Sequence, residues 1–261
     1  MNSAQKQYTN EMKRKFGYFA TWNPGLPLEL GDIGIMKNNI FNKISNIKNF
    51  NITFEIVQDS TTMDLEHFSK GSVEIATKLA GKIPPAGSVL TTLEAGVIVE
   101  FNKEKSTLFK ANNTTTNSID DGIKLGNEIL KLYKQGKWNK KWVVINELIK
   151  AENSTIIISN ASNGKIELKA NANVDLPNID IADASFDFTT QFSRGLETKF
   201  ITTNNLTPLF KIMGIKTKFL STNPDFEPVA INPLDLITPE SAKGIDKDKL
   251  VFEALNEKDI L

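Results

Sequence analysis

Residues 72–81 read SVEIATKLAG, and apolar and polar side chains alternate along this stretch. A period of two is typical of a β-strand with one apolar face. The apolar members of this alternation include Val73, Ile75 and Leu79. After a loop that contains Pro84-Pro85, residues 92–101 return with Val97 and Val99 at alternating positions. The two segments therefore predict a long antiparallel hairpin.

A second hairpin is predicted from residues 165–176 and 179–192, joined by a turn at Pro177-Asn178. The apolar side chains of these two segments occur at mostly even spacing: Ile166, Leu168, Ile181, Phe186, Phe188 and Phe192. Each of the four segments is close to the 9 to 11 residues, roughly, that a tilted strand needs to cross a bilayer. A sheet with one face in water gives the same alternation, and the pattern alone favours that plainer interpretation.

The remaining segments predict helices and shorter strands. Residues 3–16 predict a basic amphipathic helix with Tyr8, Met12 and Phe16 on its apolar stripe. Residues 118–135 predict a helix that Ser118 or Asp120 caps and Gly136 ends. Further strands are expected at 28–36, 50–57, 106–111, 142–151, 154–159 and 199–203, a short helix or turn at 206–213, and a helix at about 246–255. The predicted fold class is α+β: a twisted, mainly antiparallel mixed sheet with long hairpins, flanked by the N-terminal helix and a few further helices.

The balanced overall charge, 31 basic and 31 acidic side chains, hides an asymmetry between the two ends of the chain. Residues 1–50 carry seven basic and three acidic side chains, a net charge of +4. Residues 221–261 carry four basic and nine acidic side chains, a net charge of −5, and are punctuated by prolines. We therefore divide the chain into a body, residues 1–220, and an acidic tail, residues 221–261.

The composition excludes most catalytic and metal chemistry. The chain has no cysteine and one histidine, His67, which removes thiolate metal sites, thiol nucleophiles and histidine clusters. No phosphate-binding loop, dinucleotide-binding motif or nucleophile elbow occurs in the sequence. We expect a protein that is not an enzyme, with no catalytic residues, no metal and no cofactor.

Three weaker candidates come from the residues alone. His67 could belong to a hydrolase triad, although a surface histidine is the plainer interpretation. Asp180, Asp183 and Asp187 could supply a carboxylate pair, although acids in a strand usually line its wet face. The lysines and tryptophans of 131–142 could form a nucleic-acid patch. A solvated helix end with two core tryptophans is the plainer interpretation of that cluster, and we expect no nucleic-acid partner.

Two short motifs resemble the gasdermin family of pore-forming domains. Residues 71–76, GSVEIA, are similar to the G-S-V-E-[LI]-A start of that family's first membrane hairpin. Residues 143–148, VVINEL, are similar to its V-V-x-x-E-[VL] strand. The order of a basic helix, a long hairpin, a helix, a strand and a second long hairpin is also similar. The resemblance covers about residues 3–215.

The resemblance implies a pore-forming effector of cell death and defence that rests as an autoinhibited monomer. It would oligomerise on acidic phospholipid membranes and form a β-barrel pore from two hairpins of each copy. The lipid-headgroup contacts that the resemblance implies are Lys6, Lys13, Arg14 and Lys15. The membrane-hairpin positions are Val73, Ile75, Leu79, Val97, Val99, Ile166, Leu168, Ile181, Phe186 and Phe188. The acidic tail becomes the candidate inhibitory segment, and a protease becomes the candidate activator.

The sequence encodes no transmembrane helix and no convincing secretory signal. We therefore expect a cytoplasmic location for the inactive protein and a membrane-associated one for the active protein. The alternative function is a soluble, non-enzymatic α+β interaction module that does not enter membranes. A hydrolase that uses His67 or a carboxylate pair comes third.

Overall fold

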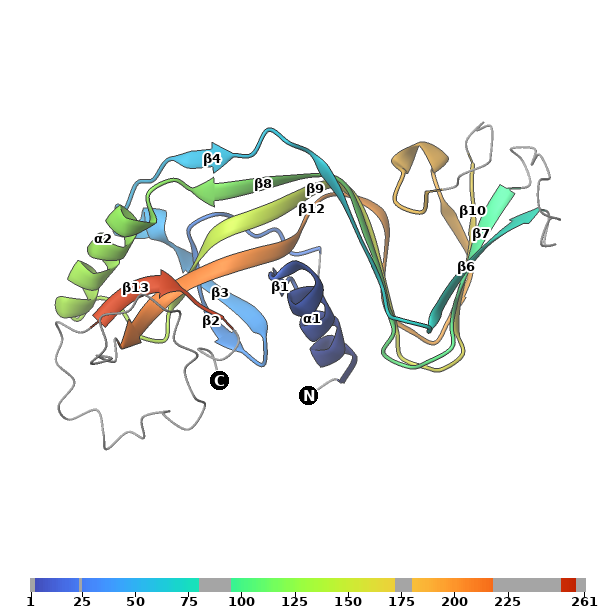
Figure 1. The fold of residues 1–261 in the computed structure, drawn as a ribbon, viewed down its shortest axis with the longest axis horizontal. Helices are drawn as coiled ribbons and strands as arrows, with labels where there is room; N and C mark the ends of the chain where they lie inside the picture. Colours follow the sequence, from blue (N-terminus) through green and yellow to red (C-terminus); the bar gives the residue numbers. More distant parts are fainter. Residues whose placement is uncertain (1–2, 24, 80–94, 172–179, 218–249, 257–261) are drawn as a thin grey trace, which may run out of the picture. The chain divides into compact units, whose positions relative to one another are not determined.

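The computed structural model describes residues 3–23, 25–79, 95–171, 180–217 and 250–256 (Figure 1). Within them the predicted fold class is confirmed: a mixed α+β fold with mostly antiparallel strands in two sheets, an N-terminal helix and one further α-helix. The helical elements are α1 (Ser3–Phe16), η1 (Ile47–Phe50), α2 (Gly122–Lys134) and η2 (Ala184–Phe186). The strands are β1 (Phe19–Ala20), β2 (Asp32–Lys37), β3 (Ile40–Asn46), β4 (Ile56–Gln58), β5 (Met63–Phe68), β6 (Val73–Leu79), β7 (Ala95–Phe101), β8 (Thr107–Ile119), β9 (Val143–Ser159), β10 (Gly164–Lys169), β11 (Thr189–Arg194), β12 (Leu196–Thr217) and β13 (Leu250–Ala254).

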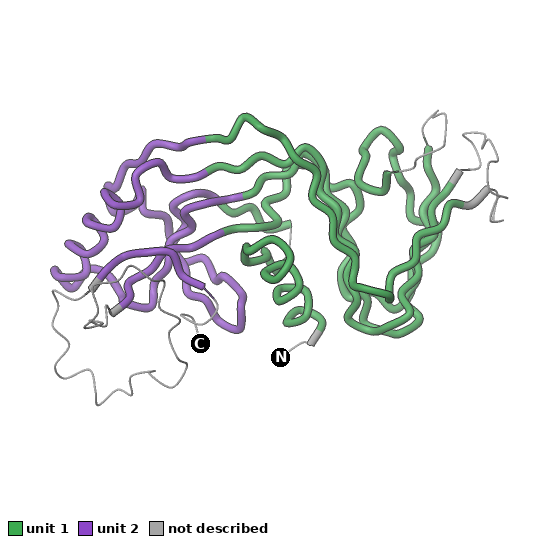
Figure 2. Tube along the Cα trace, in the orientation of Figure 1, with its two compact units in different colours: residues 1–28, 58–117, 149–210 green, residues 29–57, 118–148, 211–261 purple. Residues whose placement is uncertain are grey.

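The chain forms two compact units that interleave along the sequence (Figure 2). Unit 1 contains residues 1–28, 58–117 and 149–210, and unit 2 contains residues 29–57, 118–148 and 211–261. The division into a body and a tail near residue 220 rests on composition and stays a prediction. The described strand of that tail, β13, belongs to unit 2.

Unit 1 has two buried apolar clusters. One lies beneath α1 and includes Tyr8, Met12 and Phe109. The other includes Val99 and Leu168 from the four-stranded sheet. Because α1 buries one stripe and leaves the opposite side in water, it forms over the residues that its periodicity predicts.

Unit 2 pairs the β2–β3 hairpin with the start of β9. Its helix α2 begins after Asp121, whose carboxylate accepts a hydrogen bond from the Lys124 N–H at 2.8 Å. The cap is therefore one residue later than the predicted Asp120. The helix ends where Gly136 adopts a φ of +72°, as its sequence predicts.

Several sequence predictions are wrong. Residues 206–213 belong to strand β12, where the sequence predicts a short helix or turn, and residues 250–254 form strand β13, where it predicts a helix. The two strands expected at 142–151 and 154–159 are one continuous strand, β9. Most of 50–57 lies outside any strand, because η1 ends at Phe50 and β4 begins at Ile56.

Candidate functional site

The strands of the two predicted hairpins form one four-stranded antiparallel sheet of unit 1, in the order β11-β10-β7-β6. Figure 1 labels β6, β7 and β10 of this sheet close together. Val73 pairs with Phe101 and Leu79 with Ala95, so β6 and β7 form the first hairpin in continuous register. Strand β10 pairs with β7 on one side and with β11 on the other. Segments far apart in sequence therefore share one sheet.

The register places the predicted apolar positions on a common face. Ile166 lies opposite Val99, and Val99 lies opposite Ile75 across the next pair of strands. The side chains of Val97, Val99, Phe101, Ile166 and Leu168 are at most 1% exposed. They pack in one cluster with Leu108, Ile157 and Ile181. On the edge strand β6, however, Ile75 is 46% exposed.

The opposite face of the sheet is charged. Lys165 Nζ lies 2.9 Å from a Glu100 carboxylate oxygen and 3.2 Å from a Glu167 carboxylate oxygen. The hydrogen bond to Glu100 and, as a smaller effect, the one to Glu167 raise the pKa of the Lys165 ammonium. These contacts join β10 to β7 and so connect the two hairpins on their wet side.

The predicted strand 179–192 is wrong over most of its length. Asp180 Oδ1 accepts a hydrogen bond from the Ala182 N–H, and Asp183 Oδ1 accepts one from the Ser185 N–H. Such local bonds from aspartate to the backbone stabilise turns at the expense of a strand ladder. The result is the single turn η2, and the strand begins only at Thr189.

This turn changes the role of three predicted hairpin residues. Ile181 and Phe186 are each 3% exposed, and Phe186 stacks on Phe188 with ring centroids 5.5 Å apart. All three precede β11, so they do not lie on the apolar face of a strand as expected. Phe192, also expected on that face, pairs with Glu167 and is 44% exposed on the charged side.

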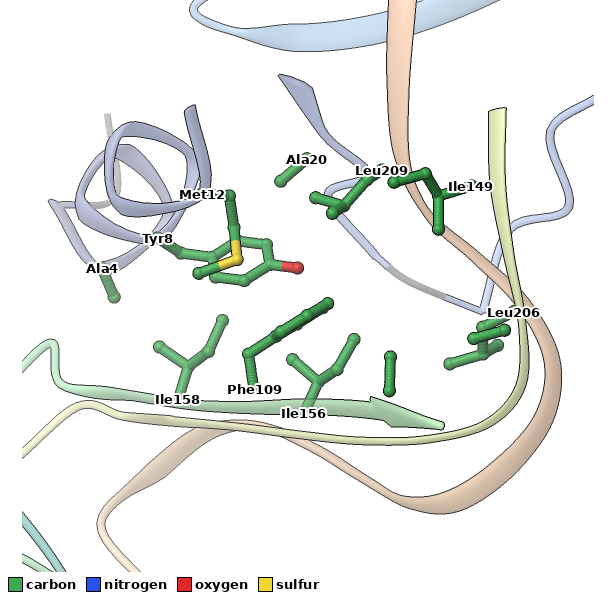
Figure 3. Packing of buried hydrophobic residues seen from close by; sticks show 12 residues of the cluster. Ala4, Tyr8, Met12, Ala20, Phe109, Ile149, Ile156, Ile158, Leu206 and Leu209 are labelled. Carbon is green, nitrogen blue, oxygen red and sulfur yellow. The ribbon is translucent and has the colours of Figure 1, made fainter. Parts of the chain in front are cut away.

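Helix α1 belongs to unit 1. Its apolar side packs on the rest of that unit, and its basic side faces water. Figure 3 shows Tyr8 and Met12 pointing from α1 toward Phe109, Ile156 and Ile158. Of the four predicted lipid contacts, Lys6, Arg14 and Lys15 are exposed. Lys13 is half-buried: its ammonium lies 4.2 Å from the Phe19 ring centroid and 3.1 Å from the Gly17 carbonyl oxygen.

The interpretation of His67 as a plain surface residue is wrong. Its Nε2 lies 3.0 Å from Glu11 Oε2, and its side chain is only 17% exposed. The Ser69 hydroxyl donates to the same Glu11 oxygen at 2.7 Å and accepts the Thr107 N–H at 2.8 Å. The serine therefore binds the carboxylate rather than the imidazole, which is not the order of a Ser-His-acid triad.

Glu11 and Ser69 are the residues that sequence reasoning missed in this cluster. Glu11 is the one acidic residue of α1, among four basic ones. In the sequence, the sign of this contact is a single acid next to the apolar stripe of a basic helix. Its partners lie 56 and 58 residues away along the chain, so the signal did not identify them.

The lysine and tryptophan cluster near the end of α2 is a packing site in unit 2. Trp138 is 4% exposed, and its ring lies 5.3 Å from Trp142 and 5.6 Å from Phe50, centroid to centroid, both in edge-on geometry. Burial lowers the pKa of the neighbouring Lys140. The tryptophan rings therefore pack on protein aromatics, as the plainer interpretation expects.

A groove of about 670 Å³ lies in unit 2 beside the first turns of α2. Its lining includes the carboxylates of Glu55, Asp120, Asp121 and Glu128 and one cation, Lys124. Because this lining is mainly acidic, an acidic lipid headgroup would be repelled there. The groove is not a site for the lipid that the resemblance implies.

The described part of the acidic tail is a strand on the edge of unit 2. β13 pairs antiparallel with the end of β12, from Thr217 opposite Leu250 to Met213 opposite Ala254. Phe252 is 8% exposed and faces α2 at Gly126, where a Cβ would lie 3.2 Å from the Phe252 Cβ.

Comparison with the models of known protein families and with curated proteins gives no match to this chain. In the described ranges, no helix has both the length and the apolar character needed to cross a bilayer. The same part of the chain contains no group of three or more acidic or histidine side chains that could hold a metal ion.

Proposed function

We propose that the chain is a gasdermin-like pore-forming protein and that the described structure is its resting, non-inserted form. The observation that supports this is the four-stranded sheet, in which β6, β7 and β10 carry apolar positions on one face and charges on the other. A strand that crosses a membrane in a pore needs this alternation, and β11, with Phe192 on the charged side, is the strand that does not have it in the described structure.

The strand directions are compatible with a closed ring of copies. Successive strands of the sheet are antiparallel, so the two edge strands β6 and β11 run in opposite directions. If β6 of one copy met β11 of the next, that pair would also be antiparallel. Each copy would add four strands, and closure would leave no open edge in the lipid.

Insertion requires longer strands than the described residues show. β6 and β7 cover seven described residues each, and β10 and β11 are six residues long. A spanning strand needs about 9 to 11 residues. The apolar face would exchange its contacts in unit 1 for lipid tails, which are as apolar as leucine, so this exchange of partners is nearly neutral in hydrophobic free energy.

The first encounter with the membrane is assigned to α1. Lys6, Arg14 and Lys15 are exposed on this helix and free to approach acidic headgroups. Each basic side chain near an anionic surface contributes about 1 kcal/mol. The tail is assigned an inhibitory role, supported by the docking of β13 on β12 and α2. Cleavage or displacement of the tail is then the activating event.

One observation favours the alternative, a soluble interaction module. The residues at the centre of the apolar face, Val99, Ile166 and Leu168, are fully buried in unit 1, so the sheet already has a complete core partner. The two functions differ in one measurable respect, because the module never opens a membrane. No enzymatic activity, cofactor or nucleic-acid partner belongs to either proposal.

The test is dye release from vesicles of phosphatidylserine and phosphatidylcholine. The full chain is compared with a chain carrying a protease site after Ser221, before and after cleavage. Release after cleavage, with ring-shaped particles on the vesicles, is expected. Absence of release and of rings under every condition would reject the pore and leave the interaction module.

A point variant separates membrane entry from folding. Ile75 is half-exposed in the resting form, so Ile75→Asp leaves the fold intact. In the inserted strand the same change places a charge on the lipid side, at a cost of about 2 kcal/mol per copy. Loss of dye release is expected for Ile75→Asp, with an unchanged circular dichroism spectrum. The matched control is Ala76→Asp, the neighbouring position on the water side of β6. Equal release from both variants would contradict the assigned faces.

A further inference from the structure

The carboxylate of Glu11 connects α1 to the chain immediately before the first hairpin. His67 Nε2 and the Ser69 hydroxyl both lie within hydrogen-bond distance of Glu11 Oε2, at 3.0 and 2.7 Å. Gln7, one turn earlier on the helix, donates to the other oxygen at 3.1 Å. An ionised carboxylate only accepts hydrogen bonds, so all three partners are donors.

Ser69 is the centre of the turn from which the first hairpin starts. Its carbonyl accepts the Ser72 N–H at 3.2 Å and the Ser72 hydroxyl at 3.0 Å. The Ser72 carbonyl in turn accepts the Asn102 N–H at 3.0 Å. Ser72 directly precedes β6 and Asn102 directly follows β7, so this turn holds both strands of the hairpin at their base. We call residues 69–72 the hairpin root.

Burial makes the Glu11 contacts hard to replace. The side chain is 11% exposed, and Ser69 and Ser72 are 5% and 3% exposed. Burial raises the pKa of Glu11, but the hydrogen bonds from His67, Ser69 and Gln7 outweigh it and hold the pKa below its ordinary value. The carboxylate therefore stays ionised at neutral pH, and separation of α1 from the root would leave a charge without these donors.

We propose that Glu11 is a latch that holds the hairpin root while α1 is docked. Movement of α1 toward an acidic membrane releases the root. β6 and β7 can then leave their packed position. This inference rests on the proposed function, because it assigns the order of two steps in pore formation. The charges of α1 fit the order. Its exposed cations are drawn toward acidic lipid, whereas its one acid faces the root.

The first experiment measures the latch without any membrane. Glu11→Gln keeps the shape of the side chain and removes its charge. Amide hydrogen exchange within residues 69–79 is expected to rise about tenfold, since a hydrogen bond to a charged group contributes to stability on that scale. Exchange in α2 of unit 2 is the internal reference. Unchanged exchange at 69–79 in the folded variant would overturn the latch.

The matched control is Glu104→Gln. Glu104 is 58% exposed and pairs with its neighbour Lys105, so the same chemical change there leaves exchange at 69–79 unaltered. If Glu11→Gln does not fold, His67→Asn replaces it, because it removes one donor and leaves the carboxylate charged. Exchange at 69–79 is again expected to rise, and the absence of a rise would again overturn the latch.

The second experiment adds phosphatidylserine and phosphatidylcholine vesicles to the full chain carrying the protease site. After cleavage, Glu11→Gln is expected to release dye faster than the unsubstituted chain, and Glu104→Gln at the same rate as that chain. Faster exchange without faster release would reject the latch as a restraint on pore formation. If no protein releases dye while exchange still rises, the latch stands as a structural link and the proposed function fails.

Discussion

The two hairpins of the four-stranded sheet reach the same architecture by different local chemistry. In the first hairpin, β6 and β7 pair over seven residues in uninterrupted register, and the restraint lies outside the ladder, at the root bound by Glu11. In the second, β10 and β11 pair over six residues with a register shift between Glu167 and Leu168. Its restraint lies in the turns made by Asp180 and Asp183, and Asp180 also binds Lys110 and Asn112 of β8.

The two hairpins therefore differ in what must be released. In the first hairpin, the Glu11 contact restrains the root, while the pairing of β7 with β10 and the buried side chains of β7 hold the strands. Loss of the Glu11 contact is expected to loosen the root that joins the two strands. The second must break several local bonds between side chains and backbone before residues 180–188 can extend. Under the proposed function, the first hairpin therefore enters the membrane before the second.

The largest effect is expected from loss of packing in the second hairpin. Leu168 is 0% exposed, and Leu168→Ala should lower the free energy of unfolding by about 2–5 kcal/mol because it leaves a cavity. Ile75→Ala at the half-exposed edge of the first hairpin should cost less than about 1.5 kcal/mol. Urea denaturation measures both values. Equal losses would mean that the two positions are equally buried in solution.

A smaller effect is expected from loss of the Asp180 turn. Its carboxylate binds the Ala182 N–H, the Asn112 amide at 3.1 Å and the Lys110 ammonium at 3.0 Å. Asp180→Ala should cost about 1–3 kcal/mol and raise amide exchange in η2, because partly buried donors lose their acceptor. Exchange at the hairpin root should stay unchanged. A rise there as well would show that the two restraints are not independent.

The smallest effect is expected from acid at the Glu11 latch. The pKa of Glu11 is lower in the folded protein than its ordinary value of 4.5, so its stabilising contribution is present above that value and lost as the pH falls through the folded value. The measurement is denaturation across the acid range, between pH 5 and pH 3, roughly. The stability difference between the unsubstituted chain and Glu11→Gln should shrink across this window. A constant difference would mean that Glu11 does not titrate with folding.

Segments with one wet face were predictable from sequence, and segments covered on both faces were not. Helix α1 has the predicted bounds, and the alternation in β6, β7 and β10 gives the correct faces. In β12, by contrast, residues 206–210 are all buried, so no period of two marks them as a strand. β3 and β5 were not predicted, because their few apolar side chains stand among charged and polar ones and none of their residues is buried.

The candidate site divides in the same way. The apolar positions on β6, β7 and β10 follow from local alternation, but those at Ile181, Phe186 and Phe188 do not. The bond from Ser69 to Glu11 joins residues 58 positions apart and depends on the tertiary fold. Asp180 and Asp183 were noted for their charge, but their effect is on backbone conformation. An aspartate can prevent a strand by binding the backbone N–H groups that follow it. The periodicity of apolar residues contains no sign of this effect.

His67 is the chain's one histidine, and its ring touches the latch. Proton NMR would therefore show a single set of imidazole resonances, with no second histidine to overlap it and no assignment to make. The protein carries its own spectroscopic probe at the contact between the N-terminal helix and the first hairpin. The state of that contact can be followed in the unmodified chain, without an added label, while lipid is titrated in.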